Sequence, residues 1–259
     1  MVLLVIVAAV FARYLAPYPG DAGPTVHFAN TLQPPSLAHL FGTDDVGRDI
    51  FSRVIFGARF ALLYPLVVLG IALLIGIPTG LIAGYWPRSV VGNVILRLTD
   101  VFLAVPPLAL ALAVTVAFKP SLATAMIAIS FTWWPWYTRL IYGETQRVTQ
   151  EAFVEATEAL GQKSLRVMFK HILPNIVSPV VVKATLDVSF VILLGASLSF
   201  LGVGAQEPTP DWGAMIAHGR LYLPSQWWVS TMPGFAIFIT VIGFNLVGDA
   251  LRDALDVMD

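Results

Sequence analysis

The chain has 259 residues, of which 57% are hydrophobic and only 12% are charged, and its formal net charge is -1. This composition excludes a soluble domain of such length, and the lack of a basic excess argues against nucleic-acid binding. No cysteine is present, which excludes disulfides, thiolate metal sites and cysteine nucleophiles. We therefore expect an all-α integral membrane protein.

Six apolar stretches predict six transmembrane helices. They cover residues 1–16, 58–86, 92–118, 120–141, 175–203 and 231–250. Longer polar segments separate them at 17–57, 142–174 and 204–230. The first stretch is expected to be a span rather than a cleaved signal, because no basic region precedes it. Pro65 and Pro78 predict bends in the second span, and Pro106-Pro107 predicts a kink or break in the third.

The orientation follows from the distribution of lysine and arginine. An even number of spans places both termini on one side of the membrane. Basic residues are more numerous on the side of the 142–174 loop than on the side of the 17–57 and 204–230 loops. The positive-inside tendency therefore places the 142–174 loop and both termini in the cytoplasm, and the other two loops outside.

The segment 151–174 is the longest charge-rich stretch of the chain and predicts two short helices joined at Gly161. One apolar stripe contains Phe153, Ala156 and Leu160, and the other contains Leu165, Met168, Phe169 and Ile172. Pro174 is expected to end the second helix. Glu151, Glu155 and Glu158 follow one another at spacings of four and three residues, so they share a face.

An amphipathic hairpin of this kind has two interpretations. It could lie on the membrane surface, but anionic lipid favours basic residues over acids on the polar face. The row of glutamates instead favours a protein partner with a basic rim that receives the helix in a groove.

Several motifs in the chain carry a family resemblance. The 151–174 segment resembles the "EAA" loop of ABC-importer permeases, which are membrane subunits without an ATPase of their own. The residues that carry this resemblance are Glu155-Ala156, then Gly161, then Ile172-Leu173-Pro174. The stretches 41–59 and 198–216 resemble the C-type permease subunit of dipeptide, oligopeptide and nickel importers, and the likeness extends over most of the chain.

This resemblance implies a type I ABC importer permease fold in the bacterial inner membrane, with the 142–174 loop coupling transport to ATP hydrolysis. The implied partners are a second homologous permease subunit, two ATP-binding subunits that use ATP and Mg²⁺, and an external solute-binding protein. This chain itself would bind no cofactor. The implied docking residues are Glu151, Glu155, Ala156, Glu158, Gly161, Leu173 and Pro174. Peptides are the expected cargo, with nickel or another small solute as the alternative.

Lys183 and Asp187 stand four residues apart within the fifth predicted span, on one face of a helix where they can pair. Ionisable groups at this depth are costly and usually face the bundle interior or water. They are therefore candidates for the translocation pathway. An ion pair that only fixes helix packing explains the same spacing.

Two segments outside the spans are candidates for contact with the binding protein or for a plug over the outer mouth. Their residues are Asp44, Arg48 and Asp49 in the first, and Pro208, Asp211 and Trp212 in the second. In the first, Thr43 or Asp44 is expected to cap a helix, and Asp49 is expected to pair with Arg53. The spacing of the acids does not match an EF-hand calcium loop.

Two other classes of protein are weighed against this interpretation. A secondary transporter would need a buried ion site, and apart from Lys183 and Asp187 the spans offer little for one. An intramembrane enzyme would need a nucleophile with a base, or paired acids, and no such motif is present in the sequence. The four histidines are scattered, so no metal site is predicted.

Overall fold

The computed structural model describes residues 1–256. The regular secondary structure of this part is helical, and it contains no strand apart from one isolated bridge between Thr43 and Asp49. The α-helices are α1 (Val2–Val10), α2 (Ala12–Leu15), α3 (Ile50–Tyr85), α4 (Val90–Leu103), α5 (Pro107–Ala117), α6 (Leu122–Thr149), α7 (Ala152–Ala159), α8 (Ser164–Arg166), α9 (Leu173–Asn175), α10 (Val177–Phe200), α11 (Trp212–Gly219) and α12 (Trp228–Asp256). Short 3₁₀ turns cover Pro19–Ala22, Phe28–Asn30 and Arg220–Tyr222, and Val167–Ile172 is a π-helical turn.

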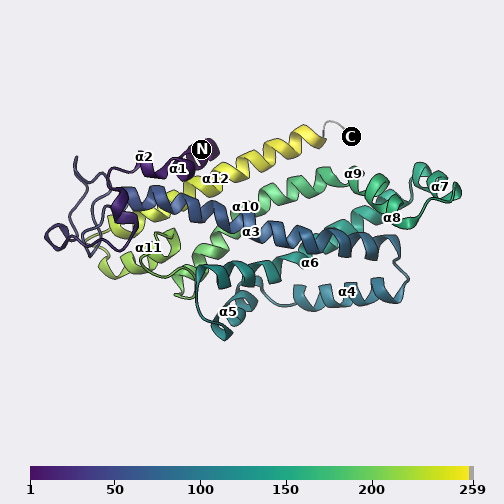
Figure 1. Ribbon diagram of the computed structural model, residues 1–259, viewed down its shortest axis with the longest axis horizontal. Helices are drawn as coiled ribbons and strands as arrows, with labels where there is room; N and C mark the ends of the chain where they lie inside the picture. The colour runs from purple at the N-terminus through teal and green to yellow at the C-terminus, as the bar shows by residue number, and fades with distance from the viewer. Residues whose placement is uncertain (257–259) are drawn as a thin grey trace.

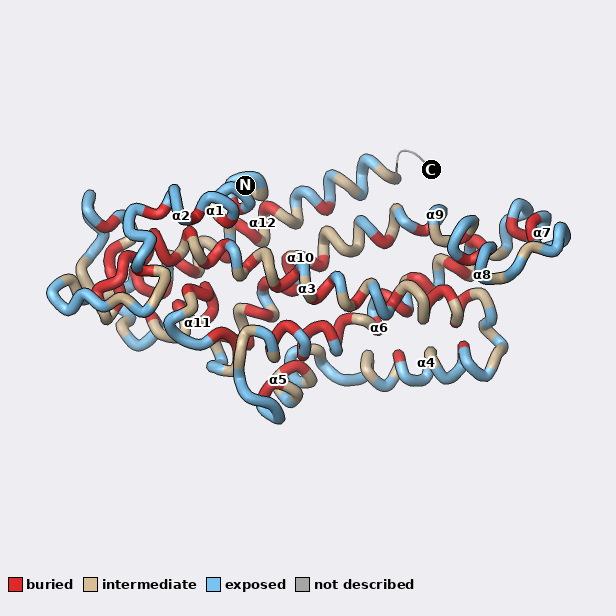
Figure 2. The backbone as a smooth tube through the Cα atoms, viewed as in Figure 1, coloured by how far each residue is buried: buried red, intermediate tan, exposed pale blue. Residues whose placement is uncertain are grey.

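The long helices α3, α6, α10 and α12 run along the long axis of the molecule (Figure 1). The 17–49 segment and α11 lie at one end of this bundle, and α7 and α8 lie at the other. Buried residues concentrate where α3, α6 and α10 meet, whereas α4 and the free end of α12 are largely exposed (Figure 2). The 151–174 hairpin therefore lies at one end of the bundle, and the 17–49 and 204–211 segments lie at the other.

Three helices are long and apolar enough to cross a membrane, namely α3, α10 and α12. A fourth crossing is possible if α4 and α5 together form one span, bent by 89°. The predicted break at Pro106-Pro107 is confirmed by this bend. The first predicted span is divided at Phe11 into a helix of nine residues and one of four, and α6 does not meet the same criterion because its second half is polar and aromatic. The structure thus shows three to four apolar spans within residues 1–256.

The most extensive helix packing lies between α3 and α6 and depends on three glycines one turn apart. A Cβ atom built on Gly76, Gly80 or Gly84 would come within 2.6–2.7 Å of a side chain of α6. In the middle of this contact the hydroxyls of Thr79 and Thr138 are hydrogen-bonded at 2.7 Å. Small residues at this spacing allow two membrane helices to approach closely, which compensates for the weak hydrophobic drive between helices in lipid.

The N-terminal end of α3 differs from the expectation. The loop region 17–57 was expected to end in a short separate helix, but residues 50–57 form the first two turns of the 36-residue helix α3. The cap of this helix is Asp49, whose carboxylate accepts a hydrogen bond of 2.7 Å from the amide of Ser52. The prediction of Thr43 or Asp44 as the cap was therefore wrong.

Candidate functional site

The hairpin that follows α6 begins with α7 and turns at Gly161. Gly161 has φ +74, a left-handed conformation that glycine adopts without strain, and its amide donates to the carbonyl oxygen of Glu158 at 2.8 Å. The predicted turn at this glycine is confirmed. The second half is less regular than expected: α8 passes into a π-helical turn, and Pro174 stands in the first turn of α9 instead of ending a helix. A proline is tolerated there because the amides of a first turn have no partner within the helix.

Most of the residues predicted to dock on a partner are exposed in the isolated chain. Leu173 is half-buried, and the exposed residues are Glu151, Glu155, Ala156, Glu158, Gly161 and Pro174. Large apolar side chains are exposed beside them, including Phe153 at 42%, Leu160 at 82% and Leu165 at 63%. Exposed acids next to exposed apolar groups form a surface that fits a partner with a basic rim and an apolar groove.

The end of α3 makes a polar contact with the hairpin. The hydroxyl of Tyr85, the last residue of α3, donates to the carboxylate of Glu158 at 2.5 Å. Both residues line a polar cavity of about 520 Å³ together with Trp86, Gln162 and others. Glu158 therefore has a partner within the chain, a contact that no sequence pattern indicated.

Lys183 and Asp187 form the predicted ion pair on α10. The Lys183 ammonium lies 2.7 Å from the Asp187 carboxylate, which also accepts a hydrogen bond of 2.9 Å from the indole of Trp133 on α6. Asp187 is buried, whereas the Lys183 side chain keeps 33% of its surface exposed. The ammonium lies about 6 Å from the ring of Tyr137, whose buried hydroxyl has no hydrogen-bond partner among residues 1–256. The pair thus fixes α10 on α6 and keeps a cation partly accessible.

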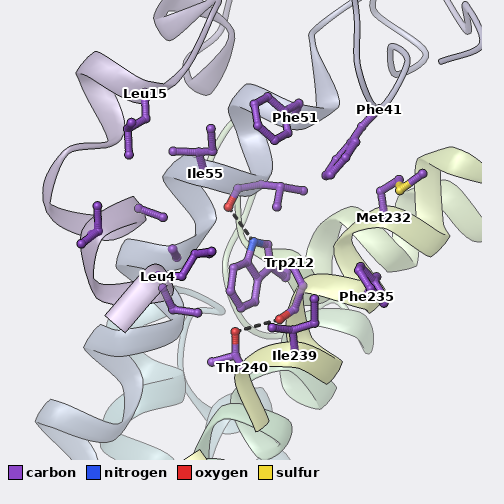
Figure 3. Close-up of a pocket in the computed structure, with 16 residues that line it drawn as sticks. Leu4, Leu15, Phe41, Phe51, Ile55, Trp212, Met232, Phe235, Ile239 and Thr240 are labelled. Carbon is purple, nitrogen blue, oxygen red and sulfur yellow. Dashed lines mark hydrogen bonds between the residues drawn. The ribbon is translucent and has the colours of Figure 1, made fainter. Parts of the chain in front are cut away.

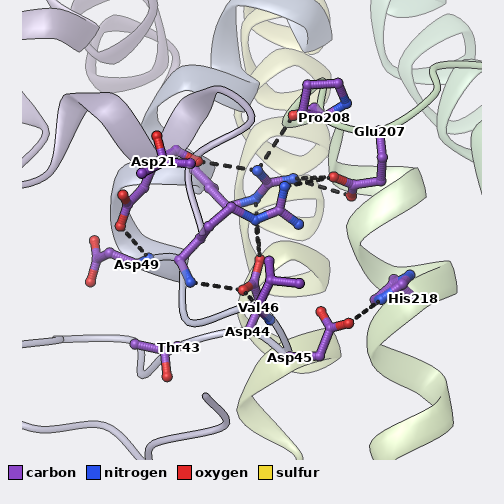
Figure 4. Close-up of polar contacts among 12 residues, drawn as sticks. Asp21, Thr43, Asp44, Asp45, Val46, Asp49, Glu207, Pro208 and His218 are labelled. Carbon is purple, nitrogen blue, oxygen red and sulfur yellow. Dashed lines mark hydrogen bonds and ion pairs between the residues drawn. The ribbon is translucent and has the colours of Figure 1, made fainter. Parts of the chain in front are cut away.

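At the opposite end of the bundle, two buried arginines converge on one glutamate (Figure 4). Glu207 lies 2.8 Å from Arg48 and 3.2 Å from Arg53, and its side chain is 40% exposed, whereas those of the arginines are 8% and 1% exposed. Arg48 also pairs with Asp44 at 2.7 Å. Burial alone would lower the pKa of Arg48, but the two carboxylates outweigh it and the pKa is raised.

The predicted ion pair between Asp49 and Arg53 is not formed. Asp49 does not pair with Arg53, because its carboxylate is held at 3.0 Å by the ring of His39 and by the amide of Ser52. Arg53 turns instead toward Glu207 and the backbone oxygens of Asp21 and Pro208. The sequence spacing was compatible with the pair, but the fold offers Arg53 a different set of acceptors.

The 204–211 segment is also held by Asp211 and Trp212. Asp211 caps α11 by accepting a hydrogen bond of 3.0 Å from the amide of Ala214, and burial raises the pKa of its carboxyl. The indole of Trp212 donates to the carbonyl oxygen of Val54 on α3 at 3.0 Å. The segment is therefore fixed to the N-terminal end of α3 by hydrogen bonds and ion pairs.

The described residues were also compared with the requirements of a metal site. Among residues 1–256, no group of three or more histidine, aspartate or glutamate side chains is arranged to hold an ion. His39 and His218 each contact a single carboxylate, of Asp49 and Asp45 respectively. These contacts join loops and helices to one another.

Residues 76–257 match the family of binding-protein-dependent transport system inner membrane components. The chain belongs to this family. The match covers the helix bundle from the last third of α3 to the end of α12, including the hairpin. The permease therefore carries the exposed hairpin within the part that defines its family.

Individual relatives agree with this assignment. The permease is 41% identical over 260 residues to the probable D,D-dipeptide transport system permease protein DdpC of Escherichia coli, covering 99% of this chain and 85% of the relative. It is 45% identical over 228 residues to the dipeptide transport system permease protein DppC of Alkalihalophilus pseudofirmus, covering 88% and 75%. A chain of the inward-facing methionine ABC transporter MetNI superposes with a TM-score of 0.65 at 19% identity, covering 79% of the permease and 97% of that chain, which shows a shared fold.

Sequence reasoning missed Glu207 and Tyr85 as contact residues of the permease. Glu207 stands 154 and 159 residues from its two arginine partners, so no local spacing indicates the contact. A glutamate directly before Pro208, in a segment otherwise poor in charge, was the available signal. For Tyr85 the signal was its position at the end of a long uncharged span.

Proposed function

We propose that this permease is one of two transmembrane subunits of an ATP-driven importer for dipeptides or oligopeptides. The similarity to dipeptide permeases over most of the chain carries the proposal for the substrate. The exposed acidic and apolar hairpin carries the proposal for coupling. In this proposal α1 with α2 and α6 complete six crossings, the hairpin and both termini are cytoplasmic, and the chain catalyses no reaction.

The proposed assembly contains a second homologous permease subunit, two ATP-binding subunits and an external solute-binding protein. The two ends of the helix bundle fit such an arrangement, because the hairpin and the fixed 204–211 segment lie at opposite ends. ATP-driven closure of the ATP-binding subunits would displace the hairpin and move the helices with it. The binding protein would deliver solute at the other end, close to Asp44, Arg48 and Asp49.

The pathway role that we propose for Lys183 rests on its partial exposure. Its ammonium is paired with buried Asp187 but keeps a third of the side chain accessible. A cation in that position offers a contact for the carboxylate of a passing peptide, while Asp187 limits the cost of holding the charge at this depth.

The coupling proposal is tested on the complex purified from its native membrane and reconstituted in proteoliposomes. Glu155→Lys reverses a charge on the exposed face of α7, and we expect loss of peptide uptake together with altered ATP hydrolysis. Asp253→Lys makes the same change on an exposed residue of α12 on the same side, and we expect uptake close to wild type. Wild-type uptake in Glu155→Lys would contradict the docking role of the hairpin.

The turn gives a second, independent test. Gly161→Pro cannot adopt the positive φ of this position, whereas Gly161→Asn tolerates a left-handed backbone. We expect the proline variant to lose uptake and the asparagine variant to keep most of it. Equal uptake in the two variants would show that the angle of the hairpin is irrelevant to coupling.

The identity of the substrate and the class of transporter are tested by the same preparation. We expect ATP-binding subunits and a second permease to be recovered with the tagged chain. We also expect ATP-dependent uptake of labelled dipeptide. ATP-dependent uptake of nickel without dipeptide would support the alternative cargo. Uptake by the chain alone without ATP would support a secondary transporter and overturn the proposal.

A further inference from the structure

An apolar cavity of about 460 Å³ lies between α1, α3 and α12, and Trp212 of α11 forms part of its wall (Figure 3). Its lining includes Leu4, Phe51, Ile55, Phe235 and Ile239. The polar side-chain groups of the lining are the indole of Trp212 and the hydroxyl of Thr240. The first donates to the carbonyl oxygen of Val54 at 3.0 Å and the second to that of Ala236 at 2.7 Å, so both are already satisfied.

The dimensions of the cavity match the depth of one leaflet. On α12 its lining runs from Met232 to Thr240, and on α3 from Phe51 to Ala58. At about 1.5 Å per residue, the eight-residue interval on α12 corresponds to ~12 Å along the helix. Half of a hydrocarbon core of about 30 Å is ~15 Å. Because α3 and α12 are long and apolar enough to cross the membrane, the cavity occupies most of the leaflet at the α11 end.

The cavity is open toward the surface that lipid covers. Leu4 and Val7 of α1 line it, yet they are 69% and 38% exposed, and Phe235 of α12 is 54% exposed. Arg13 is exposed on α2, two residues before the lining residue Leu15, and makes no ion pair with any residue of the described part. A negatively charged head group at that level would find a cation there.

The shape and chemistry of the cavity decide between occupants. A peptide would leave its amide groups without partners, because the lining has no free donor or acceptor. A helix is about 10 Å across with its side chains, so it would need a correspondingly wide opening. A flexible hydrocarbon chain needs neither hydrogen bonds nor that width, and apolar cavities readily take apolar ligands.

We propose that this cavity binds an acyl chain of a phospholipid from the leaflet at the α11 end. The chain fills the space between the short helix α1 and the spanning helices, and it contacts the wall that Trp212 forms. The lipid thereby supports both α1 and the outer segment that precedes α11. The proposal concerns the membrane-embedded chain whatever solute it transports.

The test uses the full complex in proteoliposomes that contain a phospholipid with a photoreactive diazirine on its acyl chain. After illumination, we expect the lipid on peptides that contain α1 and the first turns of α12. Ala236→Phe and Ala8→Phe fill the cavity from opposite walls, and each should lose this labelling. Ala113→Phe adds the same side chain to an exposed position of α5 and should keep it.

Gel filtration and thermal unfolding identify the variants that fold, and two filling variants keep the test decisive if one of them does not. Undiminished labelling in a folded filling variant would overturn the proposal. A photoreactive phenylalanine placed at Leu4 gives the second readout. Its attachment to phospholipid is the expected result, and its attachment to another protein chain would assign the cavity to a subunit interface instead.

Discussion

The glycine contacts between α3 and α6 allow a quantitative prediction for Gly80→Ala. A Cβ atom at this position would lie 2.7 Å from the Cβ of Ile141 and 2.9 Å from the carbonyl oxygen of Thr138. Carbon atoms in good contact are about 3.5–4.0 Å apart, so the two helices must separate by ~1 Å. Overpacking of this kind costs about 1–3 kcal/mol. We therefore expect a clear loss of stability from a single methyl group.

The same helix contains a matched control. Gly70 has no atom within 4 Å of the position that a Cβ would take, so Gly70→Ala adds the methyl group without a clash. Thermal unfolding of the two purified variants in the same detergent measures the difference. With about 2–4 °C per kcal/mol for a chain of this size, we expect Gly80→Ala to unfold ~2–12 °C below Gly70→Ala. Equal midpoints would refute the claim that this contact sets the distance between the helices.

Three further variants test single contacts. Glu207→Gln removes the shared carboxylate of two arginines and should cost about 1–2 kcal/mol, a value reduced because Glu207 is 40% exposed. Trp212→Phe removes one hydrogen bond to α3 and should cost about 0.5–1.5 kcal/mol. Tyr85→Phe removes the contact with Glu158 and should change stability by less than ~0.5 kcal/mol, but lower the peptide imported per ATP hydrolysed.

For each of these three variants, one result would contradict the prediction. Thermal unfolding of Glu207→Gln at the wild-type midpoint would show that solvent replaces the carboxylate without cost. For Trp212→Phe, unfolding at the wild-type midpoint would show that the hydrogen bond to Val54 contributes nothing to stability. An unchanged ratio of uptake to hydrolysis in Tyr85→Phe would separate the hydrogen bond from coupling.

The features that the sequence predicted correctly are set by local geometry. Gly161 occupies a turn that requires a positive φ, and Lys183 pairs with Asp187 because residues four apart share a helix face. The break at Pro106-Pro107 follows from the chemistry of proline. Each of these depends on a few neighbouring residues, so one sequence is enough to indicate it.

The features that were missed or wrong depend on distant parts of the chain. Thr43 or Asp44 was expected as the helix cap, but Asp49 takes this role while its other carboxylate oxygen contacts His39. Arg53 is drawn away from Asp49 by Glu207, which belongs to another loop. Propensity alone does not rank acids that stand so close together in the sequence, because the choice is made by tertiary contacts.

The corner between α4 and α5 restricts what can surround this chain. Ala104, Val105 and Pro106 are exposed there. The amide of Val105 donates to the carbonyl oxygen of Phe102 at 3.3 Å, but the two prolines have no amide to donate to that of Leu103. Hydrocarbon offers such carbonyls no hydrogen bond, so irregular backbone at membrane depth must lie against protein or line water. We therefore expect this flank of the molecule to lie against protein or water, in contrast to the exposed apolar face of α1.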